Sequence, residues 1–165
     1  MSSSNITIRF IEPEDQSLLV EWLQQPGVSQ WFPLIDLREI EDAVRIWMAY
    51  GLKKAGLMAL WDGVPCGNAV LNLQTDAKLA HQCLLSILVD EKYRGRGIGT
   101  QLLKDLMVLA KESFQIELLH LEVYDGNPAI RLYERMGFVQ YAVHPRFMKE
   151  LDGRYLDKVM MQRML

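Results

Sequence analysis

The sequence lacks a long hydrophobic run, a cysteine framework and any excess of positive charge. Its 165 residues contain no apolar stretch close to the roughly 18 residues that a membrane-spanning helix needs. Residues 1–5 have no positive flank and no apolar stretch, so we expect no signal peptide and a cytoplasmic protein. These absences indicate neither a membrane protein nor a secreted one.

Cysteine and histidine are few and show no arrangement typical of a disulfide framework or a metal site. The two cysteines, Cys66 and Cys83, form no CxxC pair, and free thiols in a reducing cytoplasm are the simpler interpretation. The histidines show no ligand spacing, so we expect no metal cofactor. They are His81, His120 and His144.

The charge balance is mildly acidic. Eighteen Lys and Arg stand against 21 Asp and Glu, which gives a net charge of −3 and argues against a general nucleic-acid binder. A hydrophobic content of 50% and a charged content of 24% are typical of a globular chain rather than a disordered one. Because chains divide into separate cores only beyond roughly 250 residues, we expect one domain over residues 1–165.

Hydrophobic periodicity predicts alternating strands and helices, and their order indicates a mixed α/β (α+β) sheet with helices on its faces. Asp62-Gly63 predicts a tight hairpin turn, and the apolar run Cys83–Val89, broken only by Ser86, predicts a strand buried on both faces. Pro26-Gly27 predicts the end of the first helix. The expected strands are 6–10, 56–61, 64–73, 79–89, 118–124, 140–150 and 155–164, and the expected helices are about 18–23, 37–50, 98–110 and 129–136.

A basic, glycine-rich segment lies between the strand that ends at Val89 and the helix that begins near Ile98. Glycines let the backbone turn tightly and approach a ligand, and the first N–H groups of a helix lack intrahelical partners. Arg94 and Arg96 add positive charge. The segment therefore predicts a phosphate or pyrophosphate site. Thr100 breaks the dinucleotide fingerprint GxGxxG, and no P-loop sequence is present.

Two motifs resemble one family. Arg94-x-x-Gly97-x-Gly99 after a strand resembles the acetyl-CoA-binding signature of the GNAT superfamily of N-acetyltransferases. A second block, with Leu121-Glu122-Val123, Asn127 and then residues 129–138 ending in Gly-Phe, is similar to the strand–helix segment of the same family. The C-terminal hairpin around residues 152–155 resembles the branch with ribosomal-protein, polyamine and amino-acid acetyltransferases.

The resemblance implies a mostly antiparallel central sheet of six to seven strands flanked by about four helices. It also implies transfer of acetyl from acetyl-CoA, the co-substrate, to a primary amine of a small molecule or protein N-terminus, by direct attack in a ternary complex. The residues that it implies for acetyl-CoA are Ile87, Leu88, Val89, Arg94, Gly95, Arg96, Gly97, Ile98, Gly99, Thr100, Asn127 and Tyr133.

The resemblance also implies catalytic roles. Tyr133 matches the tyrosine that protonates the departing thiolate, and Glu122 matches a glutamate used as general base. His81 is a second candidate for the base or the substrate site, and Trp31-Phe32 lies in a loop that tends to wall the acceptor site. Each residue also has a plainer interpretation, with Tyr133 in the core and Glu122 as a solvated strand residue.

The acceptor and the class of activity stay open. Acidic residues would suit a polyamine, an aminoglycoside or an amino-terminal peptide, whereas Trp31-Phe32 would suit an apolar amino acid. A non-catalytic acyl-CoA sensor on the same fold and a nucleotide-binding regulator are the rival functions. The apolar, β-rich tail offers a surface for a homodimer. The acidic residues in question are Asp36, Glu39, Glu41, Asp42 and Asp125.

Overall fold

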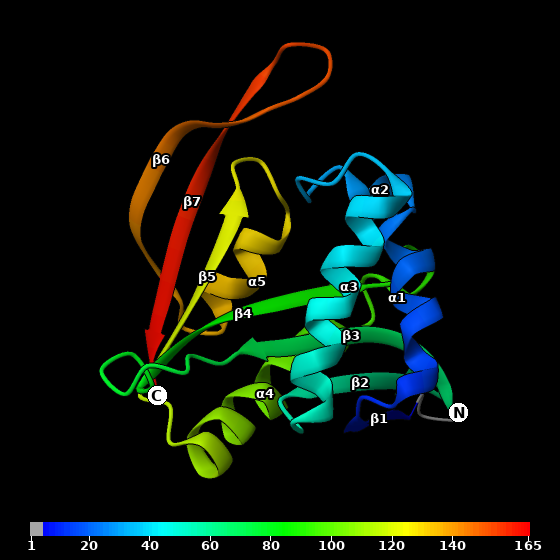
Figure 1. Cartoon of the computed structure of the whole chain (residues 1–165), viewed down its shortest axis with the longest axis vertical. Coiled ribbons are helices and arrows are strands. Elements are labelled where there is room, and N and C mark those ends of the chain that lie inside the picture. The colour runs from blue at the N-terminus through cyan, green and yellow to red at the C-terminus, as the bar shows by residue number, and fades with distance from the viewer. Residues whose placement is uncertain (1–4) are drawn as a thin grey trace.

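A single sheet organises the computed structural model, which describes residues 5–165. Its strands follow the order β1-β2-β3-β4-β5-β7-β6 (Figure 1). The strands are β1 (Ile6–Phe10), β2 (Gly56–Trp61), β3 (Val64–Asn72), β4 (Gln82–Val89), β5 (Leu118–Tyr124), β6 (Val139–Lys149) and β7 (Tyr155–Met164). The helices are α1 (Gln16–Leu23), α2 (Pro26–Ser29), α3 (Leu37–Leu52), α4 (Ile98–Phe114) and α5 (Ala129–Arg135), with short 3-10 helices η1 (Pro13–Asp15) and η2 (Glu91–Tyr93).

The sheet is antiparallel except at its centre, where β4 and β5 run parallel. These two strands pair over three positions only, from Gln82 with Leu118 to Leu84 with His120. Beyond that point β4 continues beside β3 and β5 continues beside β7. The two halves of the sheet therefore diverge, and Figure 1 shows β4 turning away from β5.

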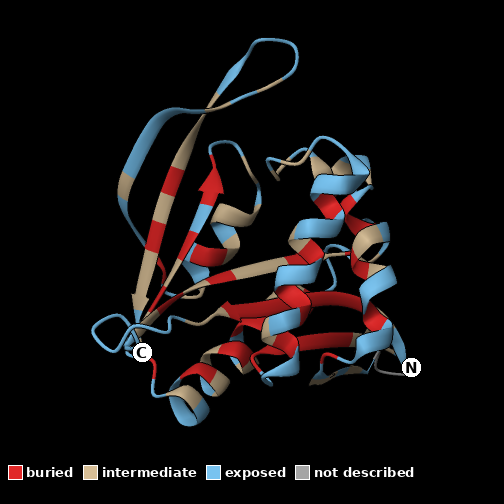
Figure 2. Ribbon diagram, in the orientation of Figure 1, coloured by how far each residue is buried: buried red, intermediate tan, exposed pale blue. Residues whose placement is uncertain are grey.

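Helices cover both faces of the sheet. One core lies under α1–α3, where Leu19, Trp22 and Val44 pack with Met58 and Val70 of the sheet. The other lies under α4 and α5, and the buried stripe along α4 appears as red bands in Figure 2. It consists of Ile98, Leu102, Leu103, Leu106 and Ala110. Apolar periodicity alone therefore explains why the helices dock as they do.

Two short-range signals explain how neighbouring elements meet. Asp62 and Gly63 both have positive φ, +47° and +83°, which suits a turn that matches the twist of β2 and β3. Gly67 of β3 lies under α4, and a Cβ built on it would stand 3.1 Å from both Ile98 and Leu102. The lack of a side chain there lets α4 approach the sheet closely.

The expected fold class is confirmed, with local differences. Pro26 begins the short helix α2 instead of only ending α1, so residues 5–165 contain five α-helices rather than about four. The strand expected from residue 79 begins at Gln82. No helix within the described range is long and apolar enough to cross a membrane.

The expectation that β4 is buried on both faces is wrong. Cys83, Leu85 and Leu88 are buried, but Ser86 and Ile87 are only half-buried, as is the rest of the strand. The reason is that part of β4 faces an open cavity rather than a second helix layer. An apolar run alone cannot distinguish a buried strand from one that lines a pocket.

A partly buried ion pair joins β1 to the start of the first helical segment. Arg9 donates to both carboxylate oxygens of Asp15, Nη1 to Oδ2 at 2.7 Å and Nη2 to Oδ1 at 2.9 Å, and the Glu12 backbone N–H donates to Oδ2 at 2.8 Å. Burial of Asp15 opposes ionisation, but these hydrogen bonds outweigh it and hold the pKa of the carboxyl below its ordinary value. Asp15 therefore stabilises the fold as a carboxylate.

Replacement of Asp15 by Asn gives a pH-dependent loss of stability. A depressed pKa contributes stability above the unfolded-state value of about 3.9, and the contribution disappears as pH falls through the folded-state value. For Asp15→Asn we expect a loss of about 1–3 kcal/mol at pH 7 by urea unfolding, shrinking below about pH 4. The exposed neighbour variant Glu14→Gln should change stability by less than about 0.5 kcal/mol. A loss that does not depend on pH would contradict the role of the carboxylate.

Candidate functional site

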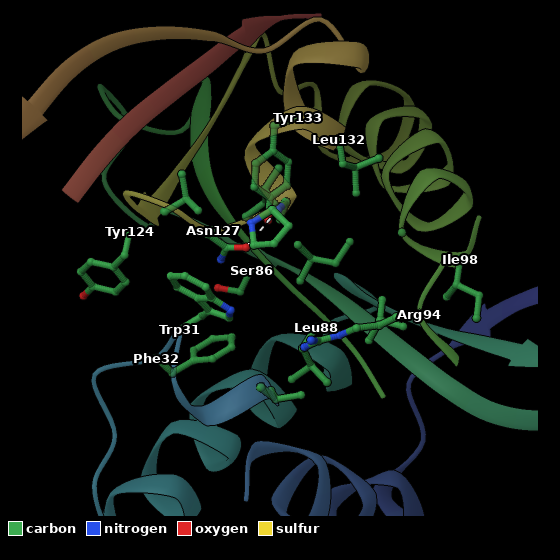
Figure 3. A pocket seen from close by; sticks show the side chains of 18 of the residues that line it. Trp31, Phe32, Ser86, Leu88, Arg94, Ile98, Tyr124, Asn127, Leu132 and Tyr133 are labelled. Atoms are coloured by element: carbon green, nitrogen blue, oxygen red, sulfur yellow. Dashed lines mark hydrogen bonds between the residues drawn. The ribbon is translucent and has the colours of Figure 1, made fainter. Parts of the chain in front are cut away.

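A cavity of about 800 Å³ opens where β4 and β5 diverge. Its floor is β4 from Leu84 to Val89, and Glu122–Tyr124 of β5 form one side. The loop after α2 lies opposite β5, and the segment from Tyr93 into α4 closes one end (Figure 3). Most of the segments that carry the predicted site therefore meet in one place.

The glycine-rich segment presents backbone to the cavity. Gly95 and Gly97 have φ of +73° and +81°, a left-handed conformation that glycine adopts at little cost. Gly97 is the N-cap of α4 and has no side chain for capping, so the first-turn N–H groups of Ile98–Thr100 border the cavity without an intrahelical acceptor. This geometry suits an anionic group, as the sequence predicted.

The two arginines of this segment point to different places. Arg94 lines the cavity, and its Nη2 donates to the Gly27 carbonyl oxygen at 2.7 Å. Arg96 is not among the cavity-lining residues, and its guanidinium carbon lies 5.1 Å from the ring centroids of both Trp61 and Tyr93. Cation–π attraction accounts for this placement. The geometry thus supports Arg94, and not Arg96, as a cavity cation.

A set of hydrogen bonds joins the α1–α2 turn to the same segment. The Gln25 side chain donates to Asp90 Oδ1 at 2.9 Å and accepts from the Glu91 backbone N–H at 3.1 Å. The Gly27 N–H donates to Glu91 Oε2 at 3.2 Å. Because Asp90 is buried and Arg94 also binds Gly27, the two loops form one unit, which we call the Gln25 bridge (Gln25, Gly27, Asp90, Glu91 and Arg94).

Tyr133 of α5 combines deep burial with access to the cavity. It is 7% exposed, its ring meets Phe138 edge-on at 6.2 Å between centroids, and it lines the cavity. Burial raises the pKa of the phenol well above its ordinary value, so Tyr133 keeps its proton at neutral pH. Asn127 lies beside it in Figure 3, and its Oδ1 accepts from the Ala129 N–H at 2.9 Å, which fixes the start of α5.

Glu122 extends into the cavity from β5. Its side chain is 44% exposed, and Oε1 lies 3.2 Å from Nζ of Lys158, a β7 residue whose side chain is only 11% exposed. The Lys158 ammonium also lies 3.7 Å from the ring centroid of Phe147. Lys158 thus holds the carboxylate in position and neutralises its charge.

The opposite end of the cavity is aromatic. Phe32 packs edge-on against Trp47, with 5.9 Å between ring centroids. Trp31 reaches toward the β5–α5 turn, because a Cβ built on Gly126 would lie 3.9 Å from its Cη2 atom. Tyr124 of β5 also lines the cavity, and Figure 3 shows Trp31 next to Ser86, with Phe32 below Trp31 in this view.

Most of the predicted site residues lie together. Of the described residues, those that line the cavity as the sequence predicts are Trp31, Phe32, Ile87, Leu88, Val89, Arg94, Gly95, Gly97, Ile98, Gly99, Thr100, Glu122, Asn127 and Tyr133. His81 does not line the cavity. It is exposed just before β4, three residues ahead of Leu84, where the cavity floor begins, and its carbonyl oxygen accepts from the N–H groups of Glu117 and Leu118. The prediction that His81 lies near the substrate is therefore not supported.

The cavity is also lined by residues that the sequence prediction did not name, and two of them are polar side chains on the strands, Ser86 and Tyr124. Ser86 sits in the middle of β4, and its hydroxyl lies 3.2 Å from Asn72 Nδ2. The signal was present, since Ser86 alone interrupts an apolar run. Tyr124 ends β5, and nothing in the local sequence distinguishes it from a core residue.

Comparison with known proteins agrees with this arrangement. A sequence model described as "Acetyltransferase (GNAT) family" matches residues 18–138. The chain is similar to the L-amino acid N-acetyltransferase AaaT of Escherichia coli (strain K12), with 24% identity over 97% of this chain and 98% of the relative. It is also similar to the spermine/spermidine N(1)-acetyltransferase of Bacillus subtilis (strain 168), with 33% identity over 54% of each chain.

A solved structure shows the same fold. It is a GNAT superfamily phosphinothricin acetyltransferase from Sinorhizobium meliloti in complex with acetyl-CoA, with a TM-score of 0.82 and 21% sequence identity. The match covers 97% of this chain and 88% of that one.

Loss of the Gln25 side chain should loosen the loop after α1. In Gln25→Ala the bonds to Asp90 and to Glu91 disappear, and a hydrogen bond to a charged group contributes about 1.5–3 kcal/mol. We expect hydrogen exchange of residues 26–34 to become roughly tenfold faster, measured by mass spectrometry. The control is Gln24→Ala, whose side chain bonds only to the Val20 carbonyl of its own helix. Equal exchange in the two variants would show that the bridge does not hold the loop.

Proposed function

Because the chain belongs to the GNAT family of acetyltransferases, we propose that it transfers the acetyl group of acetyl-CoA to a primary amine, by direct attack within a ternary complex. We further propose that residues 1–165 act as one catalytic domain. One observation carries the proposal: the N-terminus of α4, the diverging strands β4 and β5, and the buried Tyr133 all border the same cavity.

Acetyl-CoA would lie along β4. The N–H groups at the start of α4 and the Arg94 guanidinium would bind its pyrophosphate, with Gly95 and Gly97 allowing close approach. The backbone of Ile87–Val89 would hold the acyl arm and its carbonyl oxygen, since β4 has no β5 partner beyond Leu84. Asn127 would complete the far side of the acyl-arm channel.

The reaction needs three proton movements. The ammonium loses one proton before attack, the nitrogen loses a second once it is bonded to the acetyl carbon, which replaces the proton given by Tyr133, and the sulfur gains one. An alkyl ammonium, with a pKa of about 10.4, must lose a proton before its nitrogen can attack the thioester carbon. Glu122 would accept that proton, directly or through water, because it is the carboxylate on the cavity side of β5. As the carbon–sulfur bond breaks, the thiolate would take a proton from Tyr133.

Burial is compatible with Tyr133 as the acid. Burial raises the pKa of the phenol, so Tyr133 stays protonated and available as a proton donor. The same dry surroundings disfavour a free thiolate, whose pKa in water is about 8.5. Transfer from oxygen to sulfur therefore replaces one buried anion by another rather than creating an additional charge.

A primary amine as acceptor is supported by the relatives. The relative that matches nearly the whole chain acts on L-amino acids, and one that matches half acts on spermine and spermidine. The direct test is release of free CoA thiol from acetyl-CoA with panels of amino acids, polyamines, aminoglycosides and peptides with free N-termini. Tight CoA binding with no turnover on any amine would instead identify a sensor module.

Removal of the Tyr133 hydroxyl should slow turnover. For Tyr133→Phe we expect kcat to fall roughly 10–1000-fold with acetyl-CoA affinity nearly unchanged, since only a proton donor to the leaving group is lost. The matched control is Tyr141→Phe, an exposed tyrosine of β6 outside the cavity. Steady-state kinetics with calorimetric CoA titration gives both quantities, and an unaltered kcat would refute the assignment.

The two arginines provide a second test. Arg94→Ala should weaken CoA binding by about 1–3 kcal/mol, as for a charged hydrogen bond. Arg96→Ala should weaken it less, because that guanidinium lies against Trp61 and Tyr93. Isothermal titration with CoA measures both, and a greater loss in Arg96→Ala would reverse the assignment of the phosphate contact.

A further inference from the structure

The end of the cavity opposite α4 has a chemical character that bears on the acceptor. Its walls are apolar and aromatic, with Trp31, Phe32, Leu34 and Tyr124 facing the space and Trp47 packed behind Phe32. Trp47 is only 8% exposed and holds the Phe32 ring in place. Trp31 reaches toward the β5–α5 turn, where a Cβ built on Gly126 would lie 3.9 Å from its Cη2 atom.

Negative charge is sparse in the same region. Of the described residues that line the cavity, Glu122 is the only carboxylate, and Lys158 lies 3.2 Å from it. The Glu122–Lys158 pair is neutral overall. Glu122 can therefore accept from one ammonium group, but this part of the cavity has no excess of negative charge.

The acidic residues nearby in sequence do not supply further charge to the cavity. Asp36 caps α3 by accepting from the Glu39 N–H at 3.0 Å, and Glu39 accepts from the Ile35 N–H at 2.6 Å. Asp125 accepts from the Gly126 N–H at 3.1 Å. None of these three lines the cavity. The sequence alternative of an acidic site for a polycation is therefore not supported by the structure.

These features discriminate between classes of amine. A polyamine keeps one or more ammonium groups after the reacting nitrogen loses its proton. Moving each remaining ammonium group from water to an aromatic wall with no free carboxylate costs free energy. Cation–π contacts with Trp31 or Phe32 would recover only part of that cost. An amine with an aryl or alkyl body buries apolar surface against the same rings and gains free energy.

We propose that the acceptor is a primary amine with a single ammonium group and an apolar body, and that Trp31 and Phe32 are the residues that select it. The nitrogen lies between Glu122 and the thioester, and the body lies against the aromatic wall. In the reaction a nitrogen–carbon bond forms and the carbon–sulfur bond breaks. The ammonium nitrogen loses two protons in all and the sulfur gains one, so one proton is released to solvent. This inference rests on the proposed acetyl transfer.

The first experiment compares acceptors on the unmodified protein. Thiol release from acetyl-CoA is measured with 2-phenylethylamine, L-phenylalanine, 1,4-diaminobutane and spermidine. We expect kcat/KM for the better aromatic monoamine to exceed that for spermidine at least tenfold, and the two aromatic compounds show whether a carboxylate is also bound. Equal or better turnover of spermidine overturns the inference but leaves acetyl transfer standing, whereas no turnover on any amine overturns both.

The second experiment tests the aromatic wall. Trp31→Ala and Phe32→Ala should each raise KM for the aromatic monoamine about tenfold or more, as expected for loss of a large buried apolar contact, with KM for acetyl-CoA unchanged. Trp31→Phe should restore most of the affinity. The control is Phe10→Ala, an exposed phenylalanine outside the cavity. Unchanged acceptor KM in both wall variants, or an equal rise for acetyl-CoA, would show that these rings do not select the acceptor.

Discussion

The short parallel contact between β4 and β5 is the constraint on which the rest of the structure depends. Three paired positions join the two halves of the sheet, and the strands then follow different neighbours. Backbone at the centre of a sheet thereby becomes available to a ligand, because β4 beyond Leu84 no longer has β5 on that side. The cavity is a direct consequence of this divergence, and so is the half-buried character of β4.

Each helix layer contributes a different part of the site to this opening. The α4–α5 layer provides backbone N–H groups and the buried Tyr133, which suit a polyanion and a leaving thiolate. The α1–α3 layer provides the aromatic wall around Trp31. The Gln25 bridge joins the α1–α2 turn to the segment that precedes α4. The proposed acceptor and donor ends of the cavity are therefore directly connected.

The charge of the cavity differs from the net charge of the chain. The chain carries a net charge of −3, yet the cavity has Arg94 at one end and a neutralised Glu122 at the other. Most acidic side chains near the opening serve their own backbone as caps and turn acceptors. Net charge argued against a general nucleic-acid binder but carried no information on the acceptor, which we expect to depend on the few groups that face the cavity.

The sequence by itself determined most of the elements, the fold class and the position of the glycine-rich segment before α4, because periodicity, turn residues and helix starts are local properties. It also brought Tyr133 and Glu122 into consideration through motifs. Only the tertiary structure decided that Arg94 lines the cavity while Arg96 lies on aromatic rings, that His81 lies outside the cavity, and that Ser86 lines the floor. Side-chain direction and the distance between segments far apart in the chain depend on packing, which no local pattern encodes.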